Sequence, residues 1–334
     1  MKKFLLLFLS LNLTSNSMEE IFFDFERVNR SYLIYIPEKI NLNVSNNLII
    51  GLHGYTGTAS GFEKETTGGL NSIAEKYGFI AVYPQGLYFN SNQNDFPFVS
   101  SWNDLVGSKN STKSGEICAV DADIYPKYEN CKNNGRCSWT SCNDDVGFIK
   151  TILKRVNNAF NLNDVYLIGM SNGGMMAQAM ACKHPELFKA VINIVGMQHK
   201  GGSCIPKLPV NFIIYGGNND RVVPPVTIKS DDGYFYEPID KTFSNWAARF
   251  NCSNIKEEEY IYFDKFFQKT ASKCDENIKI YSILNMNRGH LWPGMTSSGG
   301  YCRTESQTDI YYPGCVDREN PWGNDFLFKI LMDL

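Results

Sequence analysis

Ser171 lies in the stretch of this chain whose residue types and spacing most clearly indicate covalent chemistry. It stands in Gly169-Met-Ser-Asn-Gly173-Gly-Met, directly after the apolar run Val165-Tyr-Leu-Ile. The run predicts a buried strand, and residues 175–182 predict a helix. Small residues around the serine suit a tight strand-to-helix turn, which brings two backbones together and exposes one hydroxyl. We therefore expect Ser171 to be a nucleophile.

A serine nucleophile needs a general base, and the chain contains four histidines. In the α/β-hydrolase fold that such a turn indicates, the acid and then the histidine follow the serine, so His53 comes too early. His184 lies where the helix after Ser171 should end, and we expect it to cap that helix. His199 lies in a polar loop, where we expect it to be solvated. His290 remains, in an irregular Gly- and Pro-containing segment of the kind that carries catalytic residues.

The acid is expected between the serine and the histidine, at the end of another strand. Residues 210–215 are apolar and β-branched and predict a core strand, which Gly-Gly-Asn-Asn-Asp220 follows. Asp220 would hold the histidine in one tautomer and stabilise the imidazolium. An aspartate that closes a turn through its own backbone is a second, compatible interpretation. Asp231, Asp232 and Asp240 are less favoured because they lie beyond the strand.

An oxyanion hole is expected from an early strand and its loop. Residues 48–52 are apolar and open into His53-Gly-Tyr55-Thr-Gly. The backbone N–H groups of Tyr55 and Asn172 would face the developing oxyanion, a contribution of about 3–4 kcal/mol per donor in comparable sites. We expect the His53 ring to brace this loop rather than to take part in catalysis.

Aromatic residues flank the predicted active-site loops. Trp102, Trp292 and the Tyr234-Phe-Tyr236 segment could stack on sugars or on a phenolic acyl group if their rings are exposed. Ordinary core packing is the alternative for each of them. Trp292 is the stronger candidate for substrate binding, because it lies two residues from the expected base.

Strands and helices alternate along the chain. Asn143 is expected to cap a helix with apolar residues at helical spacing, and Asp144 and Asp145 are interpreted as partners of its dipole rather than as a metal or acid–base pair. Strands are expected at residues 21–25, 32–36, 48–52, 79–83, 165–168, 190–195, 212–215, 259–263 and 278–284, and helices within residues 60–77 and at 146–156, 175–182, 242–250 and 325–334. This alternation predicts a mostly parallel, doubly wound sheet with helices on both faces.

Several of these segments together resemble a known family. Gly-Met-Ser-Asn-Gly-Gly-Met, Leu-His-Gly-Tyr-Thr-Gly, Asn-Asp-Arg-Val-Val-Pro, Gly-His-Leu-Trp-Pro-Gly, Ser-Trp-Asn and Asp-Asp-Val-Gly-Phe-Ile are similar to the secreted esterases that include poly(3-hydroxybutyrate) depolymerase-like proteins, feruloyl esterases and acetylxylan esterases. The resemblance covers roughly residues 30–293. It implies hydrolysis of carboxylic esters on plant-wall polysaccharides or of small esters, with Ser171, Asp220 and His290 as the triad. Residues 104–142 and 296–320 depart from the family's pattern by their length and their cysteines, and both could overhang the cleft.

The amino terminus predicts secretion. Residues 1–17 have a basic start, a short apolar core and small residues for cleavage, which is typical of a signal peptide. The remaining residues 18–334 are expected to form a single domain with a cysteine-rich insertion at about 104–142. The chain contains 10 cysteines, all after the predicted signal peptide. In an oxidising compartment we expect local disulfides: Cys182–Cys204, Cys252–Cys274, Cys302–Cys315, and pairs that fasten the insertion.

Composition narrows the function classes. Hydrophobic residues make up 43% and charged residues 20% of the chain, as in a globular protein, and the net charge is −3. This balance disfavours nucleic acid or an anionic membrane surface as a partner. We expect a monomeric serine esterase that needs no cofactor or metal and acts on feruloyl or acetyl esters of polysaccharides. A polyester depolymerase or a peptidase with the same triad, and a secreted binding protein without turnover, are the alternatives.

Overall fold

The computed structural model describes residues 18–295 and 322–334, apart from residues 39, 42–43, 67–68, 94–95, 130 and 133–134. The predicted signal peptide, the predicted Cys302–Cys315 disulfide and the departure from the family's pattern at 296–320 lie outside the described residues.

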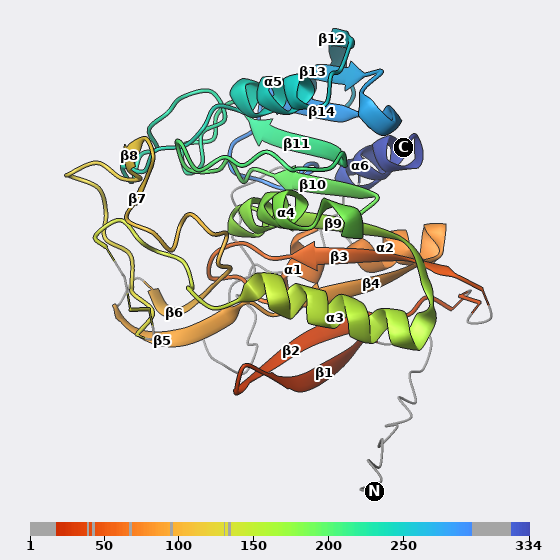
Figure 1. Cartoon of the computed structure of the whole chain (residues 1–334), viewed down its shortest axis with the longest axis horizontal. Coiled ribbons are helices and arrows are strands. Elements are labelled where there is room, and N and C mark those ends of the chain that lie inside the picture. Colours follow the sequence, from red (N-terminus) through yellow and green to blue (C-terminus); the bar gives the residue numbers. More distant parts are fainter. Residues whose placement is uncertain are drawn as a thin grey trace, which may run out of the picture.

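A large central sheet organises the fold (Figure 1). Its strands are β1 (Met18–Phe25), β2 (Val28–Tyr35), β3 (Asn46–Leu52), β4 (Phe79–Pro84), β9 (Leu162–Met170), β10 (Ala190–Ile194), β11 (Asn211–Gly217), β12 (Asn254–Ile261), β13 (Lys265–Ser272) and β14 (Ile280–Asn285). They pair in the order β1-β2-β4-β3-β9-β10-β11-β14-β13-β12. The six strands from β4 to β14 in this order run parallel, and the two ends of the sheet are antiparallel. The predicted doubly wound, mostly parallel sheet is confirmed.

Helices cover both faces of the sheet. The helices are α1 (Ala59–Glu65), α2 (Gly69–Tyr77), α3 (Asp145–Phe160), α4 (Asn172–Lys183), α5 (Ile239–Arg249) and α6 (Trp322–Met332), with short 3₁₀ turns at Pro185–Leu187 and Asp275–Asn277. In Figure 1, α3, α4 and α5 lie in front of the sheet and α1, α2 and α6 behind it. Consecutive strand residues point to opposite faces, so Ile50 packs with the front layer and Ile49 with the back layer. Both side chains are completely buried, and apolar runs of this kind are typical of parallel strands covered on both sides.

Some element predictions were wrong. The strand expected at residues 259–263 is β12, which begins at Asn254 and ends at Ile261, and its partner β13 was not predicted. β12 carries mostly exposed, charged residues, so it gives no apolar alternation to detect. The cap of α3 is Asp144 rather than Asn143, because the Asp144 side chain accepts a hydrogen bond from the Gly147 backbone.

The insertion lies beyond the carboxyl ends of the parallel strands, on the left of Figure 1. The two hairpins on this side are β5 (Leu87–Gln93) with β6 (Phe96–Ser101), and β7 (Ser111–Thr112) with β8 (Gly115–Glu116). Disulfides Cys118–Cys137 and Cys131–Cys142 fasten the insertion, as predicted. An isolated bridge between Cys118 and Tyr234 joins it to the segment that follows β11.

Two further disulfides are confirmed. Cys182–Cys204 ties the end of α4 to a neighbouring loop, and Cys252–Cys274 closes the base of the β12–β13 hairpin. Among the helices of the described residues, none has the length and apolar character required to cross a bilayer.

Candidate active site

Ser171 occupies a strained turn between β9 and α4. Its backbone has φ 55° and ψ −123°, in the left-handed half of φ space, where a residue with a side chain is strained. The Ser171 backbone donates a hydrogen bond to the Ile194 carbonyl at 2.8 Å, which fixes the turn to β10. A Cβ atom at Gly173 would overlap the carbonyl oxygens of Leu52 and His53, so only glycine fits between α4 and the end of β3. The local sequence therefore produces the predicted nucleophile turn.

Asp220 and His290 come together although they are 70 residues apart, with Asp220 Oδ2 and His290 Nδ1 separated by 2.7 Å. The other carboxylate oxygen, Oδ1, accepts hydrogen bonds from the backbone N–H groups of Val222 and Val223 at 2.9 and 2.8 Å. The Asp220 side chain is fully buried and the His290 side chain is 7% exposed. A carboxylate oriented in this way favours the imidazole tautomer with the proton on Nδ1, which leaves Nε2 to accept a proton.

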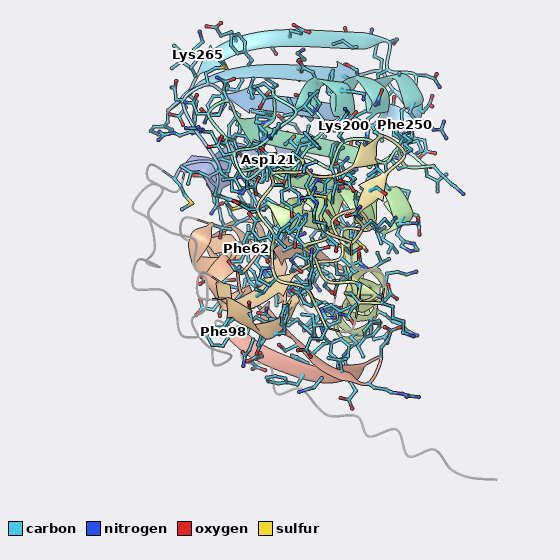
Figure 2. The ribbon with its side chains drawn as sticks, turned by 90° about the vertical axis from the view of Figure 1, so that its left-hand side faces the viewer. Phe62, Phe98, Asp121, Lys200, Phe250 and Lys265 are labelled. Atoms are coloured by element: carbon cyan, nitrogen blue, oxygen red, sulfur yellow. A yellow bond between two sulfur atoms is a disulfide. The ribbon has the colours of Figure 1, made fainter. Side chains whose placement is uncertain are left out.

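The three expected triad residues follow three parallel strands. Ser171 follows β9, Asp220 follows β11 and His290 follows β14, and these strands run in the same direction. All three residues therefore lie at the carboxyl edge of the sheet, which faces the viewer in Figure 2. Asp121 of the insertion and Phe98 of β6 are also visible from this side.

The loop after β3 lies against Ser171. A Cβ built on Gly54 would lie 3.3 Å from the Cβ of Ser171 and 3.9 Å from its hydroxyl oxygen. Asn172 is the first residue of α4, so its backbone N–H has no acceptor within the helix. The loop that carries Tyr55 and the start of α4 at Asn172 thus both lie next to Ser171, where we expect their backbone N–H groups to act as donors.

Trp102 is a structural residue, so the prediction that its ring is exposed to a substrate was wrong. The side chain is completely buried. Its indole donates a hydrogen bond to the His53 carbonyl at 2.9 Å. Its backbone N–H donates to Asn172 Oδ1 at 2.7 Å, and its carbonyl accepts from Asn172 Nδ2 at 3.2 Å. Trp102 therefore holds both the early loop and the first residue of α4, a role that sequence reasoning missed.

Trp292 is also buried, which corrects the stacking role expected for it. Its ring meets Phe62 edge to face at 5.7 Å, and its indole donates to Asn324 Oδ1 of α6 at 3.0 Å. The ring joins the layer behind the sheet instead of facing a ligand. Tyr234 and Tyr236 are likewise buried and belong to the core of the opposite layer.

The histidines outside the triad are structural. The structure supports the expectation that His53 braces the early loop, since His53 Nε2 accepts from the Gly86 backbone at 2.9 Å. His199 was expected to be solvated, but it is completely buried, with Nε2 accepting from Trp139 Nε1 at 2.8 Å. Burial lowers the pKa of each to about 4, because a desolvated imidazolium is costly. His184 caps α4 through its backbone, as expected.

The pair Asp144–Asp145 has a second role that the sequence did not reveal. Asp145 is buried and contacts Arg30 of β2 at 2.8 Å, while its other oxygen accepts from the Asn103 backbone at 2.7 Å. Burial raises the pKa of Asp145, against the opposing effect of the Arg30 charge. The carboxylate thus fixes the segment next to Trp102 and is more than a partner of the helix dipole.

The described residues contain no group of three or more His, Cys, Asp or Glu side chains that could hold a metal ion. The site instead offers a strained serine, a histidine oriented by an aspartate, and two candidate backbone donors, all at one edge of the sheet. The chemistry of the site depends on these groups.

Comparisons with known proteins agree with this fold. A sequence model of the α/β-hydrolase fold matches residues 104–212. The chain is 27% identical to Feruloyl esterase B of Neurospora crassa over 165 residues, covering 49% of this chain and 43% of that protein. It is 27% identical to Acetylxylan esterase A of Emericella nidulans over 171 residues, covering 51% and 43%. The match thus spans less than half the length of either relative.

A comparison with solved structures also supports the α/β-hydrolase fold. The structure of an acetyl xylan esterase from Aspergillus awamori superimposes with a TM-score of 0.56 at 16% identity, covering 83% of this chain and 95% of that one. The chain has the α/β-hydrolase fold, and its resemblance to feruloyl and acetylxylan esterases is confirmed.

Proposed function

We propose that this α/β-hydrolase-fold chain, similar in sequence to feruloyl and acetylxylan esterases, is a serine hydrolase of carboxylic esters. The observation that carries the proposal is the contact between His290 Nδ1 and the buried Asp220 carboxylate, at the sheet edge from which the strained Ser171 projects. A buried aspartate on Nδ1 is what a histidine needs to act as a base through Nε2. A protein that only binds its ligand would not require this pair at the same sheet edge as a strained serine.

The proposed reaction is a two-step acyl transfer. His290 takes the proton of the Ser171 hydroxyl as its oxygen attacks the ester carbonyl, and the N–H groups of Tyr55 and Asn172 stabilise the oxyanion. The tetrahedral intermediate expels the alcohol, which receives the proton from His290, and an acyl-enzyme remains. Water then gives a proton to His290 and attacks the acyl-enzyme carbonyl. As the bond to Ser171 Oγ breaks, the acid leaves and His290 returns the proton to the serine oxygen, which regenerates the free site.

Polysaccharide-linked acetyl or feruloyl esters are the substrates that we propose. The names of the relatives support this substrate class, although each match spans only 43% of those proteins. The buried positions of Trp102 and Trp292 remove them as sugar-stacking residues, so any sugar contacts come from other side chains.

Secretion is part of the proposal. Four disulfides connect described residues, and structural disulfides of this number are typical of proteins that fold in an oxidising compartment.

The test compares the disulfide-intact protein with Ser171→Ala on p-nitrophenyl acetate, methyl ferulate and acetylated xylan. Loss of the hydroxyl should lower kcat by several orders of magnitude, about 10⁴-fold or more, without changing the thermal transition. Ser253→Ala, a change at an exposed serine distant in sequence, is the matched control. Equal turnover by the wild-type protein and Ser171→Ala would disprove the proposal. Absence of turnover on all esters, amides and polyesters tested would favour a binding protein.

A further inference from the structure

The tip of the β12–β13 hairpin contacts the loop that carries His290. Asp264, at this tip, accepts two hydrogen bonds from Arg288: Nε to Oδ2 at 2.7 Å and Nη2 to Oδ1 at 2.8 Å. This fork-to-fork geometry is the most directional form of ion pair. Arg288 lies two residues before His290. The hairpin that sequence reasoning missed therefore reaches the acid–base side of the site.

Arg288 also contacts the loop that carries Asp220. Its backbone carbonyl accepts a hydrogen bond from the Asn219 backbone N–H at 2.9 Å, directly before Asp220. A Cβ atom at Gly217 would overlap the carbonyl oxygens of Arg288 and Gly289, so the two loops pack backbone to backbone. Arg288 thus joins three elements. Its side chain contacts the β12–β13 hairpin, and its main chain connects the His290 loop, to which it belongs, with the Asp220 loop.

The pair is shielded from water. The Asp264 side chain is 4% exposed and the Arg288 side chain 22%. Asn285, which is completely buried at the end of β14, donates to Asp264 at 3.0 Å and to the Tyr215 hydroxyl at 2.9 Å. Burial opposes ionisation of Asp264, but the hydrogen bonds from Arg288 and Asn285 outweigh it and lower the pKa of the carboxyl. Removing one partner of such a pair leaves the other charge partly buried, unlike an exposed ion pair.

We propose that Asp264 and Arg288 are positioning residues for the Asp220–His290 pair, a role that rests on the proposed esterase function. β14 ends at Asn285, and four residues of irregular backbone separate it from His290. The clamp formed by Asp264 and Arg288 fixes the middle of this segment to the hairpin tip, and the Arg288 carbonyl joins the same point to the Asp220 loop. Without it, the imidazole would keep its partner for a smaller fraction of the time.

The experiment uses three variants of the full chain: Asp264→Asn, Arg288→Lys and the double variant. Each keeps the size of the side chain and removes either a charge or the fork geometry. We expect each single change to lower kcat on p-nitrophenyl acetate about tenfold, with KM changed less than about twofold, because substrate contacts remain while the base is misplaced. The double variant should lose no more than the worse single variant, as for two groups that act as one unit.

Arg221→Lys is the matched control. Arg221 lies directly after Asp220 and its Nε contacts Asp231 at 2.8 Å, but both side chains are largely exposed, at 78% and 62%. This ion pair should contribute little, and kcat should stay within about twofold of the wild-type value.

A second readout is independent of turnover. The proton on His290 Nδ1 that faces Asp220 should give a low-field NMR resonance, assigned by its loss in His290→Asn. We expect it to broaden or disappear in Asp264→Asn and Arg288→Lys and to persist in Arg221→Lys. An unchanged resonance in both clamp variants would overturn the positioning role, even if their thermal transitions fell. Retained turnover in Ser171→Ala would instead overturn the esterase proposal, while the resonance would still test the clamp.

Discussion

The proposed nucleophile turn (residues 169–173) and the proposed acid–base pair (Asp220 and His290) reach the same sheet edge by different means. The turn is contiguous in sequence and is held by close backbone packing at Gly173 and by the clasp between Asn172 and Trp102. The acid–base pair joins residues 70 apart on two irregular loops. Charged side chains and main-chain contacts from the β12–β13 hairpin and the β14 end support it.

The difference shows which part of a site local sequence can specify. A tight turn is fixed by the residues within it and by the strand and helix on either side. A pair of long loops needs partners that are distant in the sequence. The nucleophile turn should therefore fail abruptly when its glycines change, whereas the acid–base pair should lose activity by degrees.

Gly173→Ala should have the largest effect. The added Cβ overlaps backbone oxygens of Leu52 and His53, which cannot rotate away, so the turn or the early loop must move. Displacement of the nucleophile by about 1 Å can cost about 100-fold in kcat, and overpacking costs about 1–3 kcal/mol of stability. Turnover on p-nitrophenyl acetate and labelling of Ser171 by a fluorophosphonate would measure the loss. Normal labelling would contradict the packing explanation.

Gly217→Ala should have a smaller effect and be confined to the acid–base pair. Its Cβ would overlap Gly289 O and push the two loops apart, and we expect kcat/KM to fall roughly tenfold, about 1.4 kcal/mol. Gly289→Ala is the comparison, since its Cβ would be 3.4 Å from the nearest atom, Asn219 O, which is ordinary contact. Steady-state kinetics of the two variants should differ clearly, and equal losses would contradict this account of the loop contact.

Removal of the Cys131–Cys142 disulfide should affect stability more than chemistry. The bridge joins cysteines 11 positions apart in the insertion. Replacement of both cysteines by serine should lower the free energy of unfolding by ~3 kcal/mol, because the unfolded chain gains conformational entropy. The insertion keeps Cys118–Cys137 and its contact with Tyr234. Urea titration would measure the loss of stability, and kcat on p-nitrophenyl acetate would measure any effect on the chemistry. A fall in kcat comparable to that of Gly217→Ala would place the insertion in the acid–base machinery.

Acid should lower the stability of the folded protein through two buried histidines. The pKa values of His53 and His199 are lowered to about 4, against roughly 6.5 in an unfolded chain, so the unfolded state binds more protons between these values. Their stabilising contribution is full above pH 6.5 and is lost as the pH falls toward 4, by about 2 kcal/mol per histidine at pH 5. Asp104, whose pKa burial raises to about 6, gives an opposite slope.

The lowered pKa values of His53, His199 and Asp264 favour a loss of stability in acid, and the raised pKa values of Asp104 and Asp145 oppose it. His199→Gln should flatten the dependence of the unfolding free energy on pH between 7 and 5, measured by urea titration. An unchanged slope would mean that His199 is not neutral in the folded protein.

The sequence predicted the strands, helices and triad candidates whose signals are local. Apolar strands such as β9 and the Gly-Met-Ser-Asn-Gly turn can be recognised without knowledge of their neighbours. β12 was predicted only in part and β13 not at all, because β12 is exposed and charged and β13 buries only Phe266 and Ala271, so neither strand has a clear apolar period. The Asp264–Arg288 pair was missed for the related reason that its members meet only after this hairpin has formed.

The burial of several loop side chains was the second feature that could not be predicted from the sequence. Trp102, Trp292 and His199 lie in loops with glycines and polar neighbours, which suggested exposure, yet all three are packed and hydrogen-bonded inside the protein. A loop beside an active site can run through the interior when the structure supplies partners for its polar atoms.

The charged strand β12 has a consequence for how copies of the protein behave toward one another. Sheet edges invite pairing with other edges, which leads to aggregation. β12, at one end of the sheet, exposes Glu257, Glu258 and Glu259, and β1, at the other end, carries Glu19 and Glu20. Charged side chains of this kind on both edge strands discourage pairing with the edge of another molecule, so the sheet should resist extension from molecule to molecule.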